Sequence, residues 1–291
     1  MVDPIAVPSS PPTSPDTLQC IGNATMLLRF GGLTVLTDPN FLHAGQRAYL
    51  GYGLSTPRLH DPALAIDELP DVDAVLLSHL HGDHFDRVAR RRLTRRAPVL
   101  TTRHAARRLA RWGFESAGLD PWEQVEVERG SVRMTVTSVP GRHGPGPLNR
   151  LLPPVMGSLV DLVDGTDGRR LRIYITGDSL LGPHVAEVAE RFPEIDLLVL
   201  HLGGTRLLGL TLTMTGEDGA ALIEALLPAQ AVPVHMDDYR IFRSPPSAFV
   251  EAARQVGMLD RVTMVPRGGT IDLAPGPWAA LRRLPQHSAL G

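Results

Sequence analysis

Short apolar segments separated by glycine-containing pairs open the patterned part of the chain. Residues 18–21, 25–30 and 33–37 are rich in apolar side chains, and the pair Gly31-Gly32 stands between the second segment and the third. Such junctions are typical of β-hairpins, so a β-meander is expected here. Residues 40–70 show no clear period and are expected to form a long loop that borders the functional site.

Strands and helices then alternate along the chain. The apolar run Ala74–Leu77 predicts a buried strand, and the other segments follow from strand-like or helix-like spacing of apolar residues. Helices are expected at 86–96, 103–112, 183–192, 217–226 and 246–256, and strands at 99–102, 131–139, 156–163, 171–176, 195–200, 231–234 and within 262–273. Two β-rich halves that each carry helices predict an α/β protein, with two sheets face to face and helices outside.

The two ends of the chain differ in composition from its middle. Residues 1–17 are rich in Pro, Ser and Thr, which predicts a disordered tail. No boundary divides residues 18–275 into two parts that could each stand alone, so a single domain is expected there. Residues 276–291 are expected to form a C-terminal tail.

Composition excludes several classes of protein. Cys20 is the only cysteine, so an intrachain disulfide and a thiolate metal cluster are excluded, and the absence of lysine excludes Schiff-base chemistry. The chain has no long apolar run and no signal-peptide pattern, so a cytoplasmic protein without stable membrane insertion is expected. The net charge of −2 gives no reason to expect a nucleic-acid partner. A small-molecule substrate is the expected partner, and the oligomeric state is left open.

The densest chemistry lies in residues 78–86, directly after a predicted strand. The candidate ligands of this segment are His79, His81, Asp83 and His84. Side chains two residues apart on an extended backbone point the same way, so His79 and His81 can converge on one point. Gly82 is expected to allow the sharp turn that brings Asp83 and His84 back from another side. Imidazole and carboxylate are the usual ligands of zinc, so the segment predicts a metal site.

Three further candidate ligands each follow a predicted strand. These residues are His143, Asp178 and His235. Strand ends at one edge of a sheet feed the loops in which sites are usually assembled, although each residue taken alone could equally have a structural role. Together with the first segment they supply seven donors, the number that two metal ions sharing a bridging carboxylate require.

The order of these residues resembles a known superfamily. His-x-His-x-Asp-His, followed by His143, Asp178 and His235, resembles the metallo-β-lactamase superfamily of metal-dependent hydrolases over residues 18–275. Within this superfamily, the chain resembles the branch that contains N-acyl-phosphatidylethanolamine-hydrolysing phospholipase D and ascorbate-6-phosphate lactonase. This finer resemblance lies in residues 22–25, 36–39 and 69–75. The resemblance implies an αββα sandwich of two mixed β-sheets with helices on both outer faces, and a dinuclear metal site on one edge.

The same resemblance implies a role for each ligand. His79, His81 and His143 would hold the first metal ion, and Asp83, His84 and His235 the second, with Asp178 bridging the two. Asp38 would orient one of these ligands. Such a site supports hydrolysis by a metal-bridging hydroxide, in which Asp83 and Asp178 are the catalytic carboxylates and either Asp83 or the hydroxide relays the proton. Zinc is the first expectation for both divalent ions, with manganese or iron as alternatives.

Differences between this sequence and the superfamily's motifs narrow the range of expected substrates. Many true β-lactamases place a cysteine in the second metal site, whereas Cys20 is far from these ligands in the sequence, which argues against antibiotic hydrolysis. The stretch between Asp178 and His235 is too short for the domain that nuclease relatives insert there. Residues 213–218 lack the histidine that the phospholipase and lactonase branch usually carries. A small ester, lactone or phosphodiester remains as the expected substrate.

Four other polar residues are weaker candidates. His201 and Asp237 are candidates for orienting a ligand or contacting substrate, with a structural role as the alternative. Arg142 and Arg206 could bind a phosphate or carboxylate, with an ordinary surface position as the alternative.

Two leucine-rich loops adjoin the candidate ligands. Loops 144–155 and 203–214 are expected to wall an apolar substrate pocket, while an oligomer interface or plain packing remain alternatives.

A basic stretch supports the alternative function. Ten arginines and no acidic residue lie between residues 87 and 111. A metal-binding, non-hydrolytic protein could contact nucleic acid or another partner through this Arg87–Arg111 face. No aromatic residues interleave with the arginines, which favours a solvated helix surface. A protein that only binds a partner does not need two open metal sites, so the full set of metal ligands favours the hydrolase.

Overall fold

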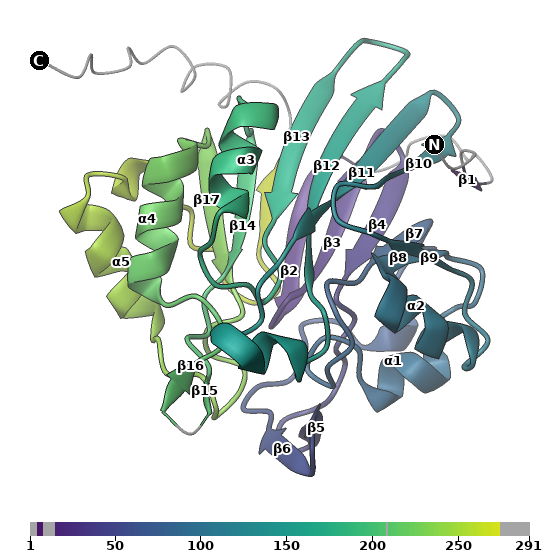
Figure 1. Ribbon diagram of the computed structural model, residues 1–291. Helices are drawn as coiled ribbons and strands as arrows, with labels where there is room; N and C mark the ends of the chain where they lie inside the picture. Colours follow the sequence, from purple (N-terminus) through teal and green to yellow (C-terminus); the bar gives the residue numbers. More distant parts are fainter. Residues whose placement is uncertain (1–4, 8–14, 208, 274–291) are drawn as a thin grey trace, which may run out of the picture.

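The computed structural model describes residues 5–7, 15–207 and 209–273, and two seven-stranded sheets form its centre (Figure 1). The first sheet consists, in spatial order, of β18 (Thr270–Asp272), β2 (Thr17–Gly22), β3 (Thr25–Phe30), β4 (Leu33–Thr37), β7 (Ala74–Leu76), β8 (Val99–Thr102) and β9 (Ser116–Leu119). Its β18-to-β4 half is antiparallel and its β4-to-β9 half is parallel.

The second sheet is mixed in the same way. It consists, in spatial order, of β1 (Ile5–Ala6), β10 (Gln124–Arg129), β11 (Val132–Pro140), β12 (Met156–Asp164), β13 (Arg170–Ile175), β14 (Leu197–His201) and β17 (Gln230–Val234). Strands β10 to β13 pair antiparallel, and β13, β14 and β17 pair parallel.

Alternation along the strands divides the apolar side chains between two faces. On β7, Ala74 and Leu76 pack into the core between the sheets, together with Val136 and Val160 of the second sheet. Val75, between them in sequence, packs outward against the helices on the first sheet. Residues that alternate in this way along a strand bury one face against the other sheet and the other face under helices.

In the part of the chain that the structure describes, five α-helices cover the outer faces of the two sheets (Figure 1). They are α1 (Arg87–Arg92), α2 (Arg103–Ala110), α3 (His184–Arg191), α4 (Gly216–Leu226) and α5 (Pro246–Gln255). Buried residues of α1 and α2 pack on the first sheet, and those of α3, α4 and α5 pack on the second. The αββα sandwich of two mixed sheets expected from the sequence is therefore confirmed.

Shorter elements lie in the connections. They are the hairpins β5 (Arg47–Gly51)–β6 (Leu54–Pro57) and β15 (Arg206–Leu207)–β16 (Leu210–Thr211), and the 3-10 turns η1 (Ile66–Glu68), η2 (Gly146–Arg150) and η3 (Leu259–Arg261). The β5–β6 hairpin lies inside the stretch 40–70, where an irregular loop was expected. No helix of the described residues is both long and apolar enough to cross a membrane.

Helix α1 shows how the sequence fixes the segment that follows the histidine-rich loop. The carboxylate of Asp86 caps the helix by accepting the backbone N–H groups of Val88 and Ala89. Its second oxygen accepts the backbone N–H groups of Phe41 and Leu42. One buried side chain thus joins the start of α1 to the segment after β4, and both segments border the histidine cluster described below.

The elements otherwise follow the predicted pattern, with three differences. Helix α1 ends at Arg92 instead of 96, because the guanidinium of Arg95 bonds the backbone carbonyls of Arg90 and Leu93 and so satisfies the helix end. Strands β9 and β10 were not predicted. Within the stretch expected to be a disordered tail, Ile5–Ala6 form β1 and pair parallel with β10. The tail expected at 276–291 lies outside the described residues.

Candidate metal centre

The histidine-rich loop and the other candidate ligands meet at one edge of the two sheets. The loop follows β7 and leads into α1. His143 follows β11, Asp178 follows β13, and His235 follows β17. Because β13, β14 and β17 are parallel, and β11 runs in the same direction as β13, their C-terminal ends lie along one edge. Pairing of the strands therefore gathers ligands that are far apart in sequence.

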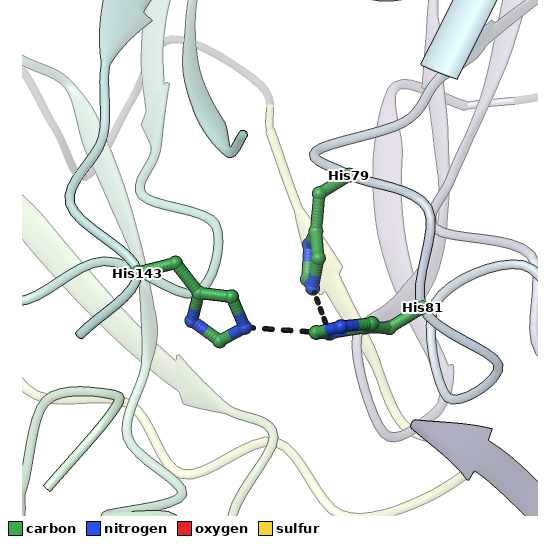
Figure 2. Close-up of side chains that lie close together, drawn as sticks. All are labelled: His79, His81 and His143. Atoms are coloured by element: carbon green, nitrogen blue, oxygen red, sulfur yellow. Dashed lines mark hydrogen bonds between the residues drawn. The ribbon is translucent and has the colours of Figure 1, made fainter. Parts of the chain in front are cut away.

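Three histidines form the first group of donors. Nδ1 of His81 lies 2.9 Å from Nε2 of His79 and 3.3 Å from Nε2 of His143. Figure 2 shows the three rings converging, with His143 approaching from the opposite side to His79 and His81. Ligand nitrogens about 2 Å from a tetrahedral zinc ion are separated by roughly 3.3 Å, so the spacing of these atoms suits a shared metal ion.

The first group is electrically suited to a metal ion. Burial, followed by the charge of the neighbouring His143, lowers the pKa of His81 to about 3. Burial and the adjacent histidines hold the pKa of His79 well below its usual value. Both rings are therefore neutral at pH 7, and a neutral imidazole keeps the lone pair that coordinates a metal.

A second group lies beside the first. It consists of Asp83, His84, Asp178 and His235, all buried. Nε2 of His84 lies 3.1 Å from Nε2 of His235 and 3.3 Å from Oδ2 of Asp178. Nε2 of His235 lies 3.5 Å from Oδ2 of Asp83. The ring centroids of His79 and His84 are 4.2 Å apart, so the two groups are adjacent.

Asp178 acts electrostatically on histidines of both groups. Burial is the larger effect on the pKa of His79 and of His143 and lowers both, but the charge of Asp178 raises each. In the second group, Asp178 is the main cause that holds the pKa of His84 above its usual value against the effect of burial. The charge of Asp178 thus acts on histidines of both groups.

Two buried carboxylate oxygens of the second group have no hydrogen-bond partner within the described residues. They are Oδ1 of Asp83 and Oδ1 of Asp178. Buried polar atoms are normally paired, and buried carboxylates need a cation nearby. These orphaned atoms and the mixture of imidazole and carboxylate donors fit divalent metal ions. Zinc suits this donor set, and manganese and iron also accept it.

Asp38 holds one ligand from behind. Its Oδ2 lies 3.2 Å from Nδ1 of His84 and 3.5 Å from Nε2 of His201, and these three residues form a third donor group. Ser78 donates its backbone N–H and its hydroxyl to the same carboxylate. Burial would raise the pKa of Asp38, but His84 and His201 lower it to about 2, so the carboxylate is ionised.

Two asparagines that the sequence did not mark as functional hold the loop in place. The side-chain amide of Asn23 donates to the carbonyl of Asp83, and that of Asn40 donates to the carbonyl of Gly82. Asn23 and His235 both have a left-handed backbone, with φ of 54° and 60°, and the backbone N–H of His235 donates to the carbonyl of Asn23. Such strained conformations persist only where the surroundings hold them, and they cluster at functional sites.

Gly82 is required for a reason other than the expected sharp turn. Its φ is outside the left-handed region, but a Cβ there would lie 2.5 Å from the backbone oxygen of Tyr49. The backbone N–H of Gly82 also donates to that oxygen. The β5–β6 hairpin can therefore approach the histidine loop this closely only at a glycine.

The remaining candidates lie at various distances from the cluster. His201 is fully buried beside Asp38, and its Nδ1 lies 3.3 Å from Oγ1 of Thr176. Asp237 is not brought into any of the three donor groups, because its side chain is 58% exposed and faces Arg267. Arg142 and Arg206 are exposed and do not line the large cleft described next.

A cleft of about 1390 Å³ opens beside His81. The β5–β6 hairpin, the exposed sides of α1 and α2 and the segment 149–155 form its walls. Of the leucine-rich loops, Leu151 and Leu152 line this cleft, while Leu212 is buried against the position of Gly144. Leu208 lies outside the described residues.

Comparison with known sequences identifies related proteins. A family model described as the beta-lactamase superfamily domain matches residues 34–236. A UPF0173 metal-dependent hydrolase from Thermus thermophilus is 28% identical over 245 residues, which cover 82% of this chain and 91% of the relative. An uncharacterized protein of Mycobacterium tuberculosis is 27% identical over 265 residues, covering 88% of this chain and 68% of that protein.

Solved structures share the fold. A possible metal-dependent hydrolase from Veillonella parvula matches with a TM-score of 0.76 and 21% identity, covering 89% of this chain and 100% of the other. An isothiocyanate hydrolase from Delia radicum gut bacteria matches with a TM-score of 0.73 and 23% identity, covering 88% and 98%. At these identities the likeness establishes a common architecture.

Proposed function

The chain belongs to the metallo-β-lactamase superfamily and is a metal-dependent hydrolase, and we propose that it works with two divalent metal ions on a small ester, lactone or phosphodiester. The observation that carries the proposal is the adjacency of two complete donor groups, three histidines in one and two histidines with two carboxylates in the other. The finer likeness to the phospholipase and lactonase branch is part of this proposal.

Each donor group has a role in the proposed site. His79, His81 and His143 would hold the first ion, with neutral imidazoles of His79 and His81 among its ligands. Asp83, His84 and His235 would hold the second ion, and Asp178, which belongs to the same donor group, would bridge the two. Zinc is the first expectation, and manganese and iron fit the same nitrogen and oxygen donors.

The chemistry follows from this donor set. Bound divalent ions would supply a water that is activated at neutral pH and would polarise the bond under attack. Asp83 accepts and passes on the proton: burial would raise its pKa, but His84 and His235 lower it, so its carboxylate is ionised. Asp38 holds the ring of His84 in a fixed orientation.

Metal content per chain tests the proposal directly. We expect about two ions per chain in the wild type, as two-metal sites hold, and a loss of metal in Asp178→Asn. His143→Ala and His235→Ala should each lower the content by about one ion, from different groups. Asp71→Asn and His60→Ala change exposed residues of the same types and should leave it unchanged. Less than one ion in folded, reconstituted wild type would contradict the dinuclear site.

Turnover tests the reaction class. Reconstituted protein should hydrolyse at least one of a panel of small esters, lactones and phosphodiesters, and His143→Ala should abolish the activity while His60→Ala keeps it. Product formation that survives complete removal of metal would contradict the proposed role of the two ions.

A further inference from the structure

The cleft beside His81 is strongly basic. Six arginines line it, from four separate segments: Arg47, Arg87, Arg90, Arg108, Arg111 and Arg150. His104 of α2 lies among them. Asp86 is the one carboxylate in the described lining, and its two oxygens already accept four backbone N–H groups. The positive charge of the cleft is therefore not balanced from within.

The arginines are not paired with acids elsewhere. In the ranges that the structure describes, none of the six lies within ion-pair distance of a carboxylate, whereas Arg92 and Arg103, on the same helices or their ends, bind Asp67 and Asp120. Arg47 bonds the hydroxyl and carbonyl of Ser55, which holds its guanidinium on the hairpin. The charge of the six guanidinium groups is therefore available to a bound anion.

The charges of neighbouring arginines act on His104 of the cleft. Partial burial lowers the pKa of this histidine, and the charges of Arg108 and Arg107 lower it further. No carboxylate is among the causes that act on it. The helix side that faces the cleft thus carries positive potential where a substrate would enter.

The other walls of the cleft are apolar and joined to each other. Leu80, Phe85 and Leu152 line its inner part. The hydroxyl of Tyr52, on the β5–β6 hairpin, donates to the carbonyl of Leu151 at 2.5 Å, so the hairpin is tied to the segment 149–155 across the cleft. This hydrogen bond crosses the cleft, which is compatible with a small molecule as the ligand. A nucleic-acid strand would instead need a continuous groove along which its backbone can run.

From these observations we propose that the cleft binds the anionic group of the substrate, held by guanidinium groups of α1, α2 and the β5–β6 hairpin, while the bond to be cleaved lies at the histidine cluster. This assignment rests on the hydrolase function proposed above and narrows its substrate to an ester, lactone or diester that carries an oxyanion. Guanidinium groups bind phosphate and carboxylate in the same bidentate manner, so the six that line the cleft suit either anion.

Nucleic acid fits these residues less well. Trp112 is an aromatic residue of the cleft lining that directly follows α2, and the guanidinium of Arg90 covers its ring at 4.2 Å. Its other contact is a stacked arrangement with Phe85. A ring packed in this way is not available for stacking on a base, which is the contact that sequence-tolerant binding of single strands uses.

Matched substrates with one leaving group test the charge preference. The reconstituted enzyme is given 4-nitrophenyl butyrate, mono-4-nitrophenyl succinate and 4-nitrophenyl 4-(phosphonooxy)butyrate. All three are cleaved at the same carboxylic ester, and away from that ester they carry no charge, a carboxylate and a phosphate, respectively. In Arg108→Ala/Arg111→Ala, KM for an anionic substrate should rise about tenfold, and KM for the neutral ester should stay unchanged. A rise for the phosphate alone identifies phosphate as the group bound, and a rise for both anions identifies a general oxyanion site.

The control variant carries the same change of net charge. Arg91 and Arg96 are exposed residues of the same basic stretch and do not line the cleft. Arg91→Ala/Arg96→Ala should leave the KM values of all three substrates unchanged. Equal effects of the two double variants would show that only overall charge matters and would overturn the assignment of the cleft.

A binding measurement separates this inference from the hydrolase proposal. Inorganic phosphate is titrated into the metal-loaded protein by calorimetry, without any turnover. Affinity that falls about tenfold in Arg108→Ala/Arg111→Ala, but not in the control, supports the cleft even if no substrate is hydrolysed. Hydrolysis of the neutral ester with no difference between the variants in phosphate binding would overturn the cleft while the hydrolase stands. Tighter arginine-dependent binding of a single-stranded oligonucleotide than of phosphate would favour a nucleic-acid site and overturn a small-molecule one.

Discussion

Oδ2 of Asp38 lies 3.2 Å from Nδ1 of His84, on the side of the ring away from Nε2, which lies 3.3 Å from Asp178. The carboxylate therefore fixes which nitrogen of His84 carries the proton and which one faces the second donor group. Because Ser78 also donates to Asp38, the loop before α1 and the end of β4 hold this arrangement together. A ligand oriented in this way is more basic and better placed for a metal ion.

Replacing Asp38 with asparagine should weaken this arrangement without removing a ligand. Asparagine keeps the size and tolerates the positive φ of 33° at this position. We expect metal affinity or activity to fall by about 10- to 100-fold, measured by competition with a chromogenic chelator and by turnover. The matched change Asp71→Asn, at an exposed aspartate, should alter neither. Wild-type metal affinity in Asp38→Asn would contradict this role.

Chelation should lower the stability of the protein. Asp38, Asp83 and Asp178 are buried carboxylates at one cluster, and removal of the cations leaves their charges less well compensated. At free zinc 100 times its Kd, binding adds about 2.7 kcal/mol to the free energy of unfolding. Thermal unfolding followed by circular dichroism should show a lower Tm after chelation and recovery after zinc is restored.

The Asp178→Asn variant provides the control for that experiment. Its Tm should respond much less to zinc, because it lacks the carboxylate proposed to bridge the ions. An equal response in the variant and the wild type would show that the stabilising zinc binds elsewhere.

A buried ion pair behind the cluster should contribute strongly to stability. Asp238 is 3.2 Å from Arg58 and also accepts the backbone N–H of Asn23, the residue that holds the loop at Asp83. Removing the carboxylate leaves the side chain of Arg58 buried without its partner. Asp238→Ala should therefore lower the free energy of unfolding by about 3–5 kcal/mol, measured by urea denaturation.

The neighbouring aspartate offers a close comparison. Asp237 is exposed, so Asp237→Ala should change the free energy of unfolding by less than about 0.5 kcal/mol. Similar losses in the two variants would mean that the buried pair is not the source of the effect.

Much of the fold and the positions of the donors followed from short-range sequence patterns. Strands such as β3 and β4 matched their expected residues because glycine turns and apolar alternation mark both ends. His143, Asp178 and His235 were found because each directly follows such a strand, and the pairing of the strands brings them to one edge. Period and turn chemistry carry this information locally.

The parts that were missed depend on contacts distant in sequence. Strand β10 alternates the buried Val125 and Val127 with acidic residues over only six positions, and this short alternation was not recognised as a strand. Asn23 and Asn40 act through backbone carbonyls, which leave no mark in a pattern of side chains. The basic stretch 87–111 was recognised, but its position beside His81 emerges only once the β5–β6 hairpin closes the cleft.

The pKa of His104 gives a direct report on the charge of the cleft. Burial lowers this pKa, and Arg108 and Arg107 lower it further, so the folded protein holds the neutral form more strongly than the unfolded chain does. The contribution of this group to stability is therefore present above the ordinary pKa of about 6.5 and is lost as the pH falls below it.

In Arg108→Ala the pKa of His104 should rise towards the ordinary value, as followed by NMR titration of the ring protons, whereas Arg91→Ala should leave it unchanged. Phosphate bound in the cleft should raise the pKa in the wild type, because its charge offsets that of the arginines, and should have little effect in Arg108→Ala/Arg111→Ala. A pKa that responds to neither the substitution nor phosphate would mean that the arginines do not act on the cleft as a group.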